Sequence, residues 1–327
     1  MQIESNANPR VHLITLNRGI RRASEFERKG LAHSAVNAGS KCGHDCLYCS
    51  TGTVLRRDKS FRQAEESPFE GGYAIVDPSA PQLVARQAKR MRSNGVHVIQ
   101  LSTFVDAWAP EAQKYDIGRQ CLEAILLNSD CHVRILTKNA AVARDFDFIE
   151  RYRERVMVGL SLTATITKAN RVAVTEPYAS PIKERLEALR QAHRRGLRTY
   201  GMLCPLLPGI ADSEKDIRWL VEQTLKYGAE EVFVEPVNAR GKGLRLTAEG
   251  LRSHGFEKEA DAVEAIRVHA NWSGYVRRVL ASTQLVMREH HALDKLRFLL
   301  YPANLTTEDG AYIRKHDAGV KWLGAGA

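Results

Sequence analysis

Short apolar segments alternate with helical segments over most of this chain, and this alternation restricts the fold more than any other feature. Strands are predicted at residues 31–40, 96–101, 132–136, 156–162, 198–203 and 231–234. Such alternation implies parallel strands joined by right-handed crossovers. Six β/α units are too few for a closed eight-stranded barrel. The sequence therefore predicts an α/β fold, a partial (β/α)6 TIM-like barrel.

The pattern changes at both ends, which predicts three regions. Residues 1–30 form a basic N-terminal lead-in, residues 31–238 the barrel, and residues 239–327 a mainly helical C-terminal extension. The extension begins with a basic loop at 240–243, and 296–301 fits one more strand. Residues 60–81 contain three prolines and a Gly-Gly pair, so a loop is expected there.

The formal net charge is +10. Basic residues lie on both sides of a cysteine-rich segment: Arg18, Arg21, Arg22, Arg28 and Lys29 before it, and Arg56, Arg57 and Lys59 after it. Such a field attracts polyanions, so a nucleic acid is the expected partner. A basic surface without a specific partner is the alternative.

The chain shows no signal-peptide pattern and no apolar stretch long enough to cross a bilayer. The spacing of its cysteines does not suggest a disulfide framework. These features predict a cytoplasmic protein without a membrane partner.

Three of the six cysteines form one C-x3-C-x2-C run, made of Cys42, Cys46 and Cys49. Soft thiolates on a short loop favour an iron–sulfur or zinc centre. With three protein ligands, a cubane cluster keeps one iron open for another molecule. A structural zinc site is the alternative, but the chain lacks the second ligand pair that such sites normally have.

Tyr48 precedes the third cysteine, and C-x3-C-x-aromatic-C resembles the signature of the radical S-adenosylmethionine (SAM) superfamily. The resemblance implies a [4Fe–4S] cluster held by the three cysteines, with S-adenosyl-L-methionine on its open iron. It also implies a 5′-deoxyadenosyl radical that abstracts hydrogen from a substrate.

Within this superfamily, the chain resembles the DNA repair photolyase and spore photoproduct lyase-like group. The matching segments occur in order at residues 101–111, 135–139, 144–145, 158–163, 176–186 and 205–212. The similarity covers roughly residues 31–235, and an ordered series is more specific than any single motif.

The resemblance assigns cofactor-binding roles by position. Lys138 would pair with the methionine carboxylate, and Ser102 or Thr103 would bond the methionine amino group. Ser161 would bind the ribose hydroxyls, and Tyr48 would line the adenine pocket. The structural alternatives are a solvated loop lysine, a serine bonded to backbone and a tyrosine that fills the core. Three further acidic residues near the same face receive no role: Asp106, Glu111 and Glu176.

The chain also departs from the photolyase pattern. That group carries a hydrogen-donating cysteine after the second strand, where this chain has Ser102 and Thr103, and a tyrosine where this chain has Ser50. Cys204, at the end of the fifth strand, could donate hydrogen instead, or it could be a buried structural cysteine. The other two cysteines, Cys121 and Cys131, are interpreted as packing residues.

The leading hypothesis is a lyase-like radical SAM enzyme that abstracts hydrogen from a nucleic acid or another anionic substrate. It implies an external one-electron donor such as flavodoxin or ferredoxin. One alternative is radical modification of a peptide or small metabolite. Another is a non-catalytic, metal-bearing nucleic-acid-binding protein.

Overall fold

The computed structural model describes residues 9–91, 96–239 and 241–324. Its main element is a nine-stranded sheet in the order β12-β11-β10-β9-β8-β7-β6-β3-β2. The strands are β2 (Ile20–Arg22), β3 (Ser34–Val36), β6 (Val98–Leu101), β7 (His132–Thr137), β8 (Val156–Ser161), β9 (Arg198–Leu206), β10 (Ala229–Pro236), β11 (Leu296–Leu300) and β12 (Val320–Trp322). All neighbours in this sheet pair in parallel except β2 with β3. The predicted fold class, a partial TIM-like barrel, is confirmed.

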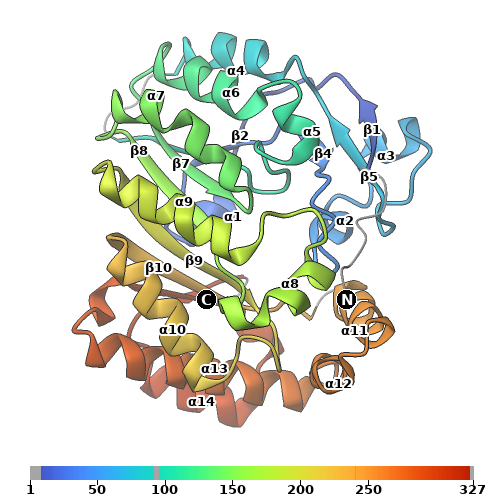
Figure 1. Cartoon of the computed structure of the whole chain (residues 1–327), viewed down its shortest axis with the longest axis vertical. Helices are drawn as coiled ribbons and strands as arrows, with labels where there is room; N and C mark the ends of the chain where they lie inside the picture. Colours follow the sequence, from blue (N-terminus) through green and yellow to red (C-terminus); the bar gives the residue numbers. More distant parts are fainter. Residues whose placement is uncertain (1–8, 92–95, 240, 325–327) are drawn as a thin grey trace.

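Helices follow most of these strands. They are α1 (Ser24–Arg28), α2 (Thr51–Val54), α3 (Lys59–Gln63), α4 (Ala80–Ala88), α5 (Pro110–Gln113), α6 (Ile117–Leu126), α7 (Phe146–Glu150), α8 (Ala169–Thr175), α9 (Ile182–Arg194), α10 (Glu214–Lys226), α11 (Gly243–Ser253), α12 (Glu257–Ala265), α13 (His269–Glu289) and α14 (Thr307–Lys315). In Figure 1, α9 lies in front of the main sheet, whereas α1 lies behind it.

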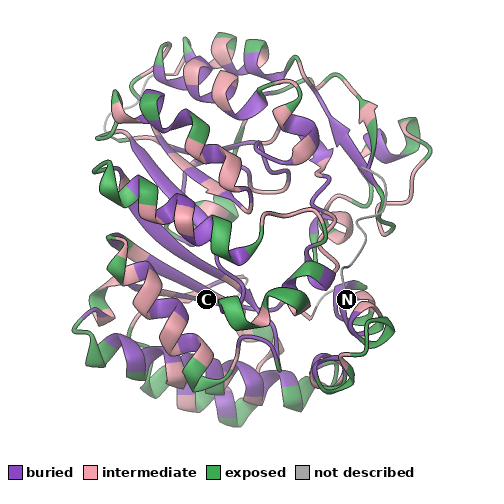
Figure 2. Cartoon of the chain, viewed as in Figure 1, coloured by how far each residue is buried: buried purple, intermediate pink, exposed green. Residues whose placement is uncertain are grey.

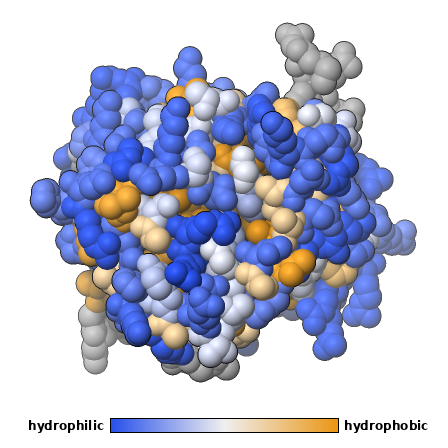
Figure 3. Space-filling view, turned by 90° about the horizontal axis from the view of Figure 1, so that it is seen from below, coloured by the Kyte–Doolittle hydropathy of each residue, from blue (hydrophilic) through white to orange (hydrophobic). Residues whose placement is uncertain are grey.

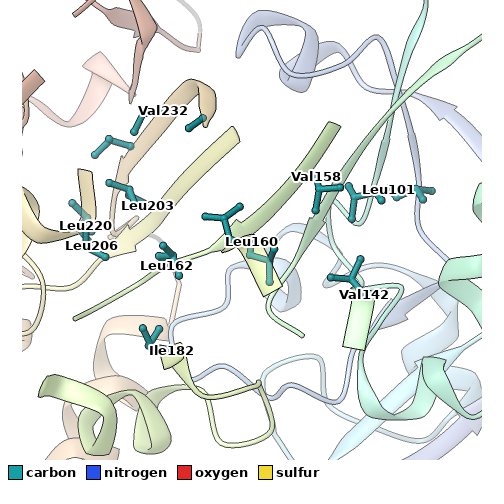
Figure 4. Close-up of a cluster of buried hydrophobic side chains, with 14 of the residues drawn as sticks. Leu101, Val142, Val158, Leu160, Leu162, Ile182, Leu203, Leu206, Leu220 and Val232 are labelled. Atoms are coloured by element: carbon teal, nitrogen blue, oxygen red, sulfur yellow. The ribbon is translucent and has the colours of Figure 1, made fainter. Parts of the chain in front are cut away.

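The two faces of the main sheet bury different side chains, because successive residues of a strand point to opposite sides. Val158, Leu160 and Leu203 pack with residues of the outer helices, as Figure 4 shows. Their neighbours Met157 and Met202 face the interior of the barrel. There they join a cluster that also includes Leu31, Tyr200, Phe233, Leu299 and Leu323. Figure 2 shows the central strands buried over nearly their whole length.

A second, three-stranded sheet lies beside the barrel in the order β1-β5-β4. Its strands are β1 (Arg10–Leu13), β5 (Tyr73–Val76) and β4 (Gly39–Lys41). Two expectations were wrong here. The single strand at 31–40 is divided between β3 and β4, which belong to different sheets. The expected loop at 60–81 contains β5, all four residues of which are buried and which pairs on both sides.

The segment beyond residue 239 supplies four helices and also two strands of the main sheet, β11 and β12. The strand expected at 296–301 is therefore confirmed. Of the basic loop expected at 240–243, Arg240 lies outside the described residues. Among the residues that are described, no helix is long and apolar enough to cross a membrane.

The surface seen in Figure 3 is mostly hydrophilic, with hydrophobic residues in small separate groups around a central hollow. The basic residues expected on the surface are exposed, with one exception. Lys29 is buried, and its side chain is only 9% exposed. It therefore belongs to the interior of the barrel and not to the charged surface.

Candidate functional site

The cysteine run lies between β4 and α2, beside the carboxyl ends of the barrel strands. Cys42 and Cys46 are half-buried, Cys49 is exposed, and none of the three forms a disulfide. The loop is held at two points. The main-chain N–H of Gly43 donates to Glu111 at 2.9 Å, and the carboxylate of Asp45 accepts from Gly72 at 2.7 Å.

The environment of two of these thiols opposes their ionisation. Burial raises the pKa of Cys42, and the nearby carboxylate of Glu111 raises it further. Burial also raises the pKa of Cys46, with Glu176 adding to the effect and Lys138 opposing it. A thiolate is stable in such a place when a positive charge binds it directly. Among the described residues, no group of three His, Cys, Asp or Glu side chains converges as a single-ion site.

Asp106, which follows β6, connects the cysteine loop with the end of β7. Its carboxylate accepts from the main-chain N–H of Lys138 at 2.8 Å and from the Thr137 hydroxyl at 2.9 Å. The ring of His44, between the first two cysteines, lies 3.4 Å away. The backbone of Asp106 also lowers the pKa of Cys42, against the larger effect of burial. One buried residue thus contacts both the cysteine loop and the main chain of a predicted cofactor residue.

Glu176 is the centre of a second buried network. Its carboxylate, with a fully buried side chain, accepts from the hydroxyls of Tyr48 and Thr163 and pairs with the guanidinium of Arg185. The ammonium of Lys138 lies 3.6 Å from the same carboxylate. Burial alone would raise the pKa of Glu176, but Arg185 and Lys138 lower it to about 2. The carboxylate is therefore ionised at neutral pH.

The carbonyl of Cys204, at the end of β9, joins two of the predicted cofactor residues. It accepts from the ammonium of Lys138 at 3.2 Å and from the hydroxyl of Ser161 at 3.1 Å. The same ammonium lies 5.7 Å from the ring centroid of Tyr48. Three residues that the sequence placed on separate segments are therefore neighbours.

The side chain of Cys204 belongs to a polar group inside the barrel. Its thiol lies 3.4 Å from the carboxylate of Glu235, at the end of β10. Both oxygens of Glu235 lie 3.4 Å from the ammonium of Lys29, which also faces the rings of Phe26 and Tyr301. Burial raises the pKa of the Cys204 thiol, and Glu235 raises it further. The thiol therefore keeps its hydrogen at neutral pH.

Ser102 and Thr103 follow β6, and both hydroxyls accept hydrogen bonds, one from a nearby residue and one from the loop after β3. The oxygen of Ser102 accepts from the main-chain N–H of Ala107 at 2.9 Å, and that of Thr103 accepts from the Asn37 amide at 2.7 Å. Each hydroxyl keeps a hydrogen to donate. Cys121 and Cys131 are fully buried in the outer core, as expected of packing residues.

Sequence reasoning missed three residues of this site: Arg185, Glu235 and Lys29. The alternation along β10 could have indicated Glu235, because it lies two residues after the interior Phe233 and therefore on the same side of the strand. Arg185 lies in the segment 176–186 that resembles the photolyase group, but the resemblance gave it no role. Lys29 gave no local signal, because lysine is rarely fully buried.

Comparisons with known proteins agree with this geometry. The profile of the Radical SAM superfamily matches residues 36–220. An uncharacterized protein, ORF301 of Acidianus two-tailed virus, is 26% identical over 213 residues, which cover 64% of this chain and 69% of the relative. The uncharacterized protein MJ0683 of Methanocaldococcus jannaschii is 24% identical over 183 residues, 56% of this chain and 64% of its own length.

Among solved structures, spore photoproduct lyase complexed with dinucleoside spore photoproduct has the same fold. Its TM-score is 0.53 with 14% sequence identity, and the match covers 74% of this chain and 66% of the lyase. A mutant of the same lyase with bound AdoMet and dinucleoside spore photoproduct also matches with a TM-score of 0.53. At these identities the likeness shows the fold alone.

Proposed function

We propose, from the premise that this chain belongs to the Radical SAM superfamily, that it abstracts a hydrogen atom from a nucleic acid or another anionic substrate. That it is a radical SAM enzyme follows from the family and the fold. The proposal concerns the substrate, the site residues and the fate of the substrate radical.

The family implies a [4Fe–4S] cluster and S-adenosylmethionine, which together supply a carbon radical when both are bound. The cysteine loop fits such a cluster. Its three thiols form no disulfide and lie on one short segment, and the surroundings of Cys42 and Cys46 favour the thiolate only when a cation binds it directly. Cys42, Cys46 and Cys49 would hold three irons and leave the fourth open.

One observation carries the cofactor assignment: Lys138 and Ser161, at the ends of adjacent strands, meet at the carbonyl of Cys204 beside the cysteine loop. Lys138 would bind the methionine carboxylate as a positive point charge. Ser161 would bind the ribose hydroxyls, and Tyr48 would contact the adenine. The hydroxyl oxygen of Ser102 or Thr103 would accept a hydrogen bond from the methionine amino group.

Cys204 would return a hydrogen atom to the substrate radical. The S–H bond breaks, a C–H bond forms on the substrate, and a thiyl radical remains on Cys204. One electron from an external donor such as flavodoxin or ferredoxin, with one proton, restores the thiol. The interior position of this thiol at a strand end, together with its raised pKa, supports the assignment.

The net charge of +10 and the exposed arginines of the N-terminal segment support an anionic substrate. The dinucleoside bound by spore photoproduct lyase points to nucleic acid rather than to a peptide. The six cysteines, none of which forms a disulfide, support a reducing, cytoplasmic location.

Anaerobic reconstitution with iron and sulfide, followed by dithionite and S-adenosylmethionine, tests the proposal. We expect 5′-deoxyadenosine from the wild-type chain and none from Cys46→Ala, which should still fold. Cys204→Ala should form 5′-deoxyadenosine without completing product. A fully loaded, reducible cluster that yields no 5′-deoxyadenosine with DNA or RNA present would contradict the proposal.

A further inference from the structure

A cavity of about 310 Å³ lies at the start of the C-terminal extension. Its lining consists of Ala239, Gly241, Lys242, Leu244, Arg245 and Arg267. Half of these residues are cations, and none of the described lining residues is acidic. A water molecule in the liquid occupies about 30 Å³. The cavity is therefore large enough for a phosphate with an attached sugar.

This cavity is directly beside the cysteine loop. A Cβ added to Gly243 would lie 2.8 Å from the carbonyl oxygen of Tyr48, and one added to Gly241 would lie 2.1 Å from the hydroxyl of Thr53. The glycines therefore allow the backbone before α11 to pack against the loop and against α2. A group held in the cavity would be fixed relative to the cluster cysteines.

The cations of the cavity are available to a ligand. Arg245 pairs with Glu249 one turn further along α11, at 2.9 Å, and Arg267 pairs with Glu264; all four side chains are substantially exposed. Exposed pairs of this kind contribute little to stability, so a phosphate can replace them at small cost. Lys242 lies 5.0 Å from the ring centroid of Phe69.

The start of α11 adds to the positive potential. The first turn of this helix contains no acidic residue, and no side chain among the described residues caps it by a hydrogen bond. Its first N–H groups and the positive end of the helix dipole therefore reinforce the three cations.

We propose that this cavity binds a backbone phosphate of a nucleic-acid substrate and so aligns the strand with the site of hydrogen abstraction. The inference rests on the proposed function and specifies its substrate. Arginine recognises a phosphate through two parallel hydrogen bonds, whereas lysine contributes a point charge. Both kinds of cation line the cavity.

Binding of a fluorescent single-stranded oligonucleotide to the reconstituted protein, measured by anisotropy over a range of salt concentrations, tests the proposal. The variant is Lys242→Gln/Arg245→Gln. The control is Arg86→Gln/Lys89→Gln, which removes two exposed cations from the distant α4 region. We expect the first variant to weaken binding on the order of tenfold, and to reduce the slope of log K against log [salt] by about 1.4, two phosphate contacts at about 0.7 each. The control should bind like the wild type.

Equal affinity and slope for the two double variants would overturn the proposal. Titration with a mononucleotide separates the sources of phosphate. If only mononucleotide binding depends on Lys242 and Arg245, the cavity serves a small ligand and the assignment to a strand is wrong.

The formation of 5′-deoxyadenosine in the presence of the oligonucleotide is measured on the same samples. If it occurs while oligonucleotide binding is insensitive to the variant, the cavity assignment alone is wrong. If it fails with a loaded cluster, the proposed function is wrong whatever the binding result.

Discussion

Two ionic groups lie within the same site, and they are built differently. Glu176 is fully buried, and its carboxylate bonds two hydroxyls and the guanidinium of Arg185. Glu235 lies 3.4 Å from both the ammonium of Lys29 and the thiol of Cys204, with 16% of its side chain exposed. The first group is saturated by close donors, whereas the contacts of the second are long.

This difference separates two tasks. A saturated network fixes the residues that bond to it, here Tyr48 and Lys138, which are the predicted cofactor residues. The looser group surrounds Cys204, which we propose as the hydrogen donor to the substrate radical. Under this proposal, rigid support of the cofactor and adaptable contacts toward the substrate lie at neighbouring strand ends.

Removing Arg185 should produce the largest effect. Arg185→Met leaves the carboxylate of Glu176 buried without its main partner, so we expect a loss of about 3–5 kcal/mol in the free energy of unfolding. Urea denaturation of the apo protein measures it. Arg190→Met, in the exposed pair on the same helix, is the matched control and should cost far less stability than Arg185→Met. Equal losses of unfolding free energy in the two variants would show that the buried network around Glu176 contributes no more to stability than an exposed ion pair.

The low pKa of Glu176 gives this network a pH signature. Its folded-state pKa of about 2 lies below the unfolded value of about 4.3, so its stabilisation is complete above the unfolded pKa and is lost as the pH falls through about 2. The difference in stability between the wild type and Glu176→Gln should therefore shrink below about pH 4. A difference that stayed constant down to pH 2 would contradict the assignment.

Removing the cation of the looser group, Lys29, should reduce stability less than removing Arg185. Lys29→Met leaves Glu235 without its cation, but Glu235 is partly exposed, so we expect a loss of about 1–3 kcal/mol. Burial would lower the pKa of Lys29, yet Glu235 and the other acidic groups around the ammonium together outweigh burial and raise that pKa. The stabilisation is thus complete below about pH 10.4 and is lost as the pH rises through the higher folded-state pKa. The free energies of unfolding of the wild type and of Lys29→Met, each measured at pH 8 and above pH 11, test this. A loss for Lys29→Met larger than that for Arg185→Met would show that the group around Glu235 is the more important of the two for stability.

The smallest change in stability is expected for Asp106→Asn, about 1–2 kcal/mol, since the amide still accepts one of the hydrogen bonds. Its amide nitrogen would face the donors at the end of β7 and displace Lys138. We expect iron content to be retained while S-adenosylmethionine binds several-fold more weakly, measured by equilibrium dialysis. Unchanged affinity would mean that Asp106 only supports the fold.

The sequence predicted what depends on local pattern. The alternation of strands and helices indicated the barrel, and the polar residues after strands 96–101, 132–136 and 198–203 indicated its functional edge. The side sheet was missed because β4 and β5 have only three and four residues and are bounded by glycine and proline. Lys29 was assigned to the surface because its partner Glu235 is 206 residues away, a separation that no local pattern reveals.

That separation also affects how the protein is made. Lys29 of the first helical segment meets Glu235, and Glu25 accepts from the hydroxyl of Tyr301, 276 residues later. During synthesis, the interior of the barrel therefore cannot be completed until Tyr301 has left the ribosome. Contacts of such long range form slowly, because a large loop must close first. The part of the site around Cys204 and Glu235 is accordingly expected to be the last to assemble, after the local β/α units that carry Lys138 and Ser161.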